Sequence, residues 1–88
     1  MKIKDGFILR EVAGNFIVVP VGDAVAEFNG MINLNETGAF LWKLLQEDVE
    51  PKFLLAELLK EYDVDENIAK KDIEAILNKL YTAGVLNA

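Results

Sequence analysis

The chain has 88 residues, of which 52% are hydrophobic, and nine basic against fifteen acidic residues give it a formal net charge of −6. This composition predicts one packed domain over residues 1–88, whose small core buries only about 60–65% of the unfolded surface. The acidic balance, with Arg10 as the sole arginine, argues against a nucleic-acid partner, because binding phosphates requires clustered lysine and arginine.

The side chains that most often carry catalysis are missing, since the sequence contains no histidine, cysteine or serine. Its densest acidic group, Asp63, Asp65 and Glu66, lacks the glycine and the spaced ligands of a calcium loop. We therefore expect a protein that is not an enzyme and holds no metal or cofactor. No apolar run is long enough for a membrane span or a signal peptide, so we expect a cytoplasmic protein without a membrane partner.

Two short runs rich in β-branched and aromatic residues predict a hairpin near the N-terminus. They are residues 7–12 (FILREV) and 16–21 (FIVVPV), separated by three residues that include Gly14. Pro20 cannot donate a backbone hydrogen bond, so that end of the second strand should be unpaired on its donor side. A third strand is predicted over residues 28–33 (FNGMIN), after a stretch with no clear preference.

Three helices are predicted after the strands. The first begins at the capping residue Asn35, the second spans residues 51–62 with proline at its first position, and the third spans residues 65–82 and ends before Gly84. Helical periodicity predicts their buried residues: Leu34, Gly38, Leu41, Trp42 and Leu45; then Leu55, Leu58, Leu59 and Tyr62; then Ala69, Ile73, Ile76, Leu77 and Leu80. Strands followed by helices indicate an α+β domain with the helices on one side of an antiparallel sheet.

Gly38 is an unusual choice within a helix, where glycine costs about 1 kcal/mol relative to alanine. Its place on the buried stripe predicts a packing notch that lets another backbone approach. Phe40 and Phe53 are predicted to point away from the buried stripes, where each could anchor a partner.

The third strand is the first candidate binding surface. The first strand is protected from pairing by Arg10 and Glu11, whereas residues 28–35 carry no charge, and Gly30 would let a partner backbone approach. The sequence leaves two alternatives open, in which a helix or the N-terminus covers this edge, or the edge pairs with its own copy to form a homodimer.

One face of the third helix is the second candidate surface. Ile68, Asp72, Ala75 and Lys79 follow helical spacing, with Lys71 at the margin. As the wall of a groove, this face would offer an apolar contact, room beside the alanine, and charges that read a peptide. The alternative is an ordinary solvated face with one stray isoleucine.

The runs VAGNFIVVPVG and FNGMINLNETGAFLWKLL, a helix ending in YDVD, and a last helix followed by AGVL resemble the family of pyrroloquinoline-quinone biosynthesis protein D (PqqD). The resemblance implies a winged-helix-like domain, with three N-terminal strands and three helices, that acts as a recognition element for ribosomally made, modified peptides. Such a domain is a non-catalytic accessory protein of biosynthesis. It binds the leader of a precursor peptide and presents it to a modifying enzyme, often a radical S-adenosylmethionine enzyme.

In that family the leader pairs with the third strand and lies beside the third helix. The residues that this resemblance assigns to peptide binding are Gly30, Met31, Ile32, Asn33, Ile68, Lys71, Asp72, Ala75 and Lys79. Proline at position 32 is then expected to abolish binding by removing a backbone donor. The rival functions are a winged-helix DNA-binding regulator, disfavoured by three lysines against four acidic residues in residues 65–82, and a structural or dimerisation subunit.

Overall fold

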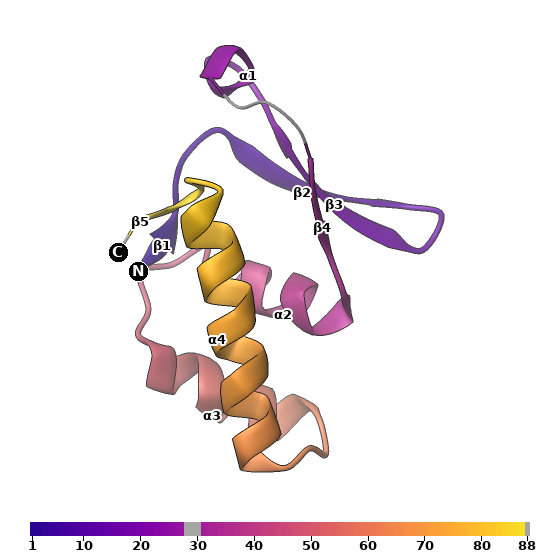
Figure 1. The fold of residues 1–88 in the computed structure, drawn as a ribbon, viewed down its shortest axis with the longest axis vertical. Helices are drawn as coiled ribbons and strands as arrows, with labels where there is room; N and C mark the ends of the chain where they lie inside the picture. Colours follow the sequence, from indigo (N-terminus) through magenta and orange to yellow (C-terminus); the bar gives the residue numbers. More distant parts are fainter. Residues whose placement is uncertain (28–30, 88) are drawn as a thin grey trace.

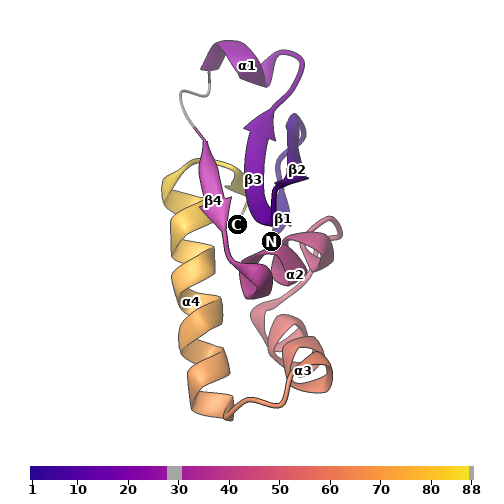
Figure 2. The same ribbon diagram turned by 90° about the vertical axis from the view of Figure 1, so that its right-hand side faces the viewer.

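A three-stranded antiparallel sheet, in the order β2-β3-β4, forms one layer of the fold. The structure is a computed structural model and describes residues 1–27 and 31–87. The strands are β2 (Phe7–Val12), β3 (Asn15–Pro20) and β4 (Ile32–Leu34). Figures 1 and 2 show the helices α2, α3 and α4 on one side of this sheet. The predicted α+β architecture, with a three-stranded sheet followed by helices, is therefore confirmed.

The hairpin between β2 and β3 closes with a two-residue loop. Ala13 and Gly14 both have positive φ angles, of 52° and 81°, the combination of a type I′ turn, whose twist matches that of the strands it joins. Val12 lies opposite Asn15, so Asn15 belongs to β3 and the predicted three-residue connection is wrong by one residue. Pro20 lies opposite Phe7 at the end of the strand.

The segment between β3 and β4 contains a short helix, α1 (Ala24–Glu27), which the sequence pattern did not predict. Of the predicted third strand over residues 28–33, residues 32 and 33 belong to β4, which continues to Leu34, while Met31 precedes it. Residues 28–30 lie outside the described part of the chain, as does the last residue.

Local capping fixes the bounds of the longer helices. The Asn35 side chain accepts a hydrogen bond of 2.7 Å from the Gly38 amide at the start of α2 (Glu36–Leu44). Pro51 is the first residue of α3 (Pro51–Glu61). An N–H at this position would have no acceptor within the helix, so proline costs no hydrogen bond there. Asp65 accepts from two amides at the start of α4 (Glu66–Thr82), which ends before Gly84, with φ 79°. The predicted starts of α2 and α3, at Asn35 and Pro51, and the predicted end of α4 before Gly84 are confirmed.

The core lies between the sheet and the helices. Its largest fully buried side chains are Leu41, Leu45, Leu54, Leu58, Leu80, Val18 and Val85. The second predicted stripe is rotated, because α3 buries Leu54 with Leu58, while Leu55, Leu59 and Tyr62 are partly buried. Phe40 is also partly buried, and its ring meets that of Tyr62 edge to face at 5.6 Å. Phe40 therefore faces the core, contrary to prediction, whereas Phe53 is 42% exposed as expected.

A second, two-stranded sheet joins the two ends of the chain. The strands β1 (Lys2–Ile3) and β5 (Leu86–Asn87) pair antiparallel, and Ile3 and Leu86 are both buried. Strands of two residues leave no periodic pattern, so this sheet could not be predicted from the sequence. Among the described residues, no helix combines the length and the apolar character needed to cross a bilayer.

Candidate functional site

The outer edge of β4 presents its backbone away from the rest of the sheet. In a two-residue hairpin the residues that flank the loop form a hydrogen-bonded pair, and such pairs alternate with non-bonded ones along the strands. Val12 and Asn15 flank the loop, so Ile17 points its backbone groups towards β2. Since Ile17 lies opposite Asn33, the Asn33 N–H and C=O point to the open edge of β4.

A lysine of α4 marks this edge. Lys79 donates a hydrogen bond of 2.6 Å from its Nζ to the backbone carbonyl of Asn33. This contact shows that the carbonyl points to the side that faces α4, where the ammonium group of Lys79 occupies it. It also shows that the outer edge of β4 and the helix lie side by side, as Figure 2 illustrates.

The face of α4 next to this edge is the one identified in the sequence. Ile68, Asp72, Ala75 and Lys79 are all exposed, and Ile68 is 55% exposed. Their spacing places them along one side of the helix over a length of about 16 Å. Lys71 is exposed at the margin of the same face. An extended segment could therefore lie along the β4 edge with this helix face as its second wall.

The structure divides the predicted strand residues into separate roles. Met31 is 66% exposed and lies just before β4, whereas the Ile32 side chain is only 7% exposed and belongs to the core. Because Ile32 lies opposite Val18 in a hydrogen-bonded pair, its N–H points to β3 and bonds within the sheet. The expectation that proline at Ile32 would remove a donor from a bound peptide is thus wrong, and that role falls to Asn33. Gly30 lies outside the described residues.

The contact between Lys79 and Asn33 was missed by the sequence interpretation, which assigned the lysine to reading charges on a peptide. The two residues are 46 positions apart, so no local pattern could place the ammonium group on a strand carbonyl.

The groups with shifted pKa values lie away from the β4 edge. The hydrogen bond from the N-terminal ammonium lowers the pKa of Asp48, and burial, with the nearby carboxylates of Glu36 and Glu61, raises the pKa of Tyr62.

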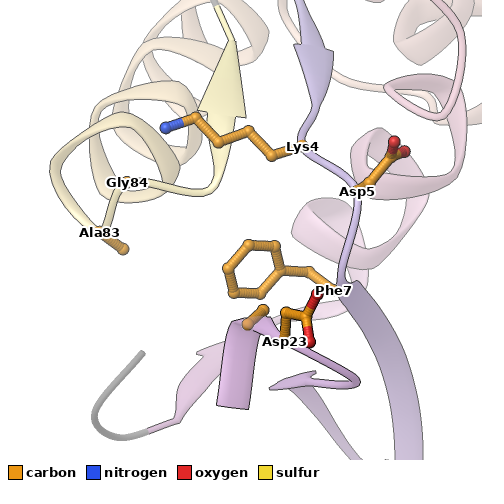
Figure 3. A pocket seen from close by; sticks show the side chains of 7 residues that line it. Lys4, Asp5, Phe7, Asp23, Ala83 and Gly84 are labelled. Atoms are coloured by element: carbon orange, nitrogen blue, oxygen red, sulfur yellow. The ribbon is translucent and has the colours of Figure 1, made fainter. Parts of the chain in front are cut away.

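A hollow of about 430 Å³ lies between the C-terminal end of α4 and the start of α1 (Figure 3), lined by Lys4, Asp5, Phe7, Asp23, Ala24, Ala83 and Gly84. The ring of Phe7 points into it, and the carboxylates of Asp5 and Asp23 point in different directions. Among the described residues no three acidic side chains gather in a way that could hold a metal ion. The hollow therefore offers no set of converging polar groups comparable to the β4 edge.

An edge strand with outward backbone groups, flanked by an exposed helix face, defines a class of small α+β domain that can accept a further strand. The chain belongs to the family of coenzyme PQQ synthesis protein D (PqqD), whose family model matches residues 8–86. This confirms the resemblance seen in the sequence. No curated protein matches this sequence.

Two solved structures share the fold over nearly the whole chain. TbiB1 in complex with the TbiA(beta) leader peptide is 22% identical, with a TM-score of 0.77, and the match covers 100% of this chain and 96% of that one. Lasso peptide synthetase B1 complexed with the leader peptide is 20% identical, with a TM-score of 0.73, covering 99% and 96%. At these identities the likeness establishes the common fold.

Proposed function

We propose that this protein is a non-catalytic chaperone that binds the leader of a ribosomally made precursor peptide as an added strand on β4. The observation that carries the proposal is the outward-facing backbone of Asn33, beside the exposed face of α4. Backbone hydrogen bonds to such an edge provide affinity, and side-chain contacts with the flanking surface provide specificity. The family membership and the leader-peptide complexes of the two structural neighbours support the same function.

The bound peptide would lie between the edge of β4 and the face of α4 that carries Ile68, Asp72 and Ala75. Ile68 offers an apolar contact, and the small side chain of Ala75 leaves room for a peptide side chain. A peptide N–H that bonds to the Asn33 carbonyl would replace Lys79 there. Asp72 and the released Lys79 carry opposite charges on this face, so they can then select both the charge and the direction of the peptide.

Presentation of the leader to a separate modifying enzyme completes the proposed role, and a radical S-adenosylmethionine enzyme is the partner we propose. The chain itself has no histidine, cysteine or serine with which to modify a peptide. Binding of the peptide and binding of the enzyme are thus two separate events, each of which can be measured alone.

Replacing Asn33 with proline tests the added strand directly. Proline removes the outward N–H while leaving the amides of Ile32 and Leu34, which face β3, in place. We expect the peptide to bind about 5- to 150-fold more weakly, because one peptide carbonyl loses its donor at a cost of about 1–3 kcal/mol. The probe is the N-terminal half of the precursor peptide encoded beside the gene, and its binding is measured by amide NMR titration of the labelled protein.

The matched control is Asn33→Ala, which removes the side chain but keeps the backbone donor. This variant should bind the peptide nearly as well as the parent, with shifts clustered in residues 31–34 and 68–79. A folded Asn33→Pro variant that bound the peptide with the parent's affinity would rule out strand addition at β4.

A further inference from the structure

The side of the three-stranded sheet that faces away from α2, α3 and α4 is an apolar surface, which none of these helices covers (Figures 1 and 2). Because side chains alternate along a strand, and Val18 faces the core, its neighbours Ile17 and Val19 face outwards. Their cross-strand partners are Arg10 and Ile8. We call this surface the outer face; it consists of Ile8, Arg10, Val12, Asn15, Ile17, Val19 and Asn33.

The outer face is more apolar than an ordinary solvated sheet surface. Ile8 is 37% exposed and Val12 is 54% exposed, while Ile17 and Val19 are half-buried between their neighbours. An antiparallel sheet with one solvated face normally alternates apolar residues inside with polar residues outside. Here apolar side chains occupy both faces, which is typical of a surface that another protein covers.

Arg10 is the only charged residue of the outer face. Its neighbour Glu11 points to the opposite side of the sheet, because successive side chains alternate. In the described part of the chain, the ion pairs join the N-terminus to Asp48, Lys60 to Glu57 and Lys70 to Glu66. None of these involves Arg10, so the guanidinium group is available to a partner.

These charges decide between possible partners. A second copy packed against the outer face would bury both Arg10 side chains without any carboxylate, since the face contains none, and an unpaired buried charge is strongly destabilising. A nucleic acid or an anionic membrane is disfavoured by the net charge of −6. A protein surface that is apolar and carries a carboxylate opposite Arg10 meets both requirements.

We infer that the outer face is the docking surface for the enzyme that modifies the bound peptide, and that an acidic residue of this enzyme pairs with Arg10. The inference rests on the proposed function. Asn33 links the two surfaces, because its side chain belongs to the outer face while its backbone forms the peptide-binding edge. An enzyme seated on the outer face would therefore lie beside the peptide held on β4.

Charge reversal at Arg10 tests this docking surface. The binding of the purified modifying enzyme encoded beside the gene is measured by calorimetry for the parent, for Arg10→Glu and for Lys52→Glu. The last variant makes the same change of charge on α3, away from the sheet. We expect Arg10→Glu to weaken enzyme binding at least 10-fold and Lys52→Glu to change it less than 2-fold. Replacing the enzyme's acidic residues with arginine, one at a time, should identify one change that restores binding to Arg10→Glu.

Several results would overturn the inference. These are an enzyme that binds a folded Arg10→Glu variant as well as the parent, an enzyme that does not bind the parent at all, and sedimentation showing a dimer of the parent that Arg10→Glu dissociates. Arg10→Gln replaces Arg10→Glu if the latter does not fold. Peptide affinity is measured separately for each variant and should be unchanged by Arg10→Glu. If the parent protein did not bind the peptide, the proposed function would be refuted. The enzyme measurement would still test the outer face.

Discussion

Gly38 shows how a single missing side chain lets three elements meet. A Cβ atom built at this position would lie 3.0 Å from Ile76 Cδ1, 3.1 Å from Leu34 Cβ and 3.2 Å from Asn35 Oδ1. The predicted packing notch is therefore present, although it admits the side chain of Ile76 rather than another backbone. The glycine lets α4 pack against α2 at the point where β4 enters the helix.

Replacing Gly38 with alanine is expected to lower the free energy of unfolding by about 1 kcal/mol. The helix gains about 1 kcal/mol of intrinsic propensity, but the added methyl group overpacks the core at a cost of roughly 1–3 kcal/mol. Urea denaturation followed by the fluorescence of Trp42, which is 3% exposed, measures the change. The control is Ile76→Val, which removes the nearest atom. This second change should cost less in the Gly38→Ala background than alone, and equal costs would show that the two positions do not interact.

At the scale of elements, the hydrogen bond from Lys79 to Asn33 joins α4 to the free edge of β4. Replacing Lys79 with methionine removes the ammonium group but keeps a long apolar side chain. We expect a loss of about 1 kcal/mol in the free energy of unfolding, which is the usual net contribution of one hydrogen bond to stability. Protection of the β4 amides from hydrogen exchange should fall more than that of β2. Lys71→Met, at the margin of the same helix face, is the matched control. Similar exchange in the two variants would contradict a specific role for Lys79.

Elements whose signals are local were predictable from the sequence. Asn35 and Gly84 marked helix ends because each acts on backbone groups within a few residues. The rotation of α3 that buries Leu54, and the reach of Lys79 to Asn33, depend on segments far apart in the chain. The same limit applied to the candidate site. The sequence located the uncharged strand and the helix face, but only the register of β3 and β4 shows that Asn33, and not Ile32, offers its amide to the edge.

On the scale of the whole molecule, the sheet of β1 and β5 ties the ends of the chain to the helical core. Ile3 donates from its amide to the carbonyl of Leu45, and Lys4 donates to that of Val85, both at 2.9 Å. Leu86 is 5% exposed and follows directly after α4 and its glycine cap. The terminal sheet thus holds the C-terminal end of the helix that forms one wall of the candidate site.

Replacing Leu86 with alanine should therefore destabilise the entire fold and not only the end of the chain. We expect a loss of about 2–4 kcal/mol in the free energy of unfolding, the usual cost of removing a buried leucine side chain. The midpoints measured by Trp42 fluorescence and by far-ultraviolet circular dichroism should shift together, because small single domains unfold cooperatively. Asn87→Ala, in the same strand but at an exposed position, should change both midpoints little. If Leu86→Ala separated the two midpoints, the terminal sheet would unfold on its own, and α4 would keep its place beside β4 without it.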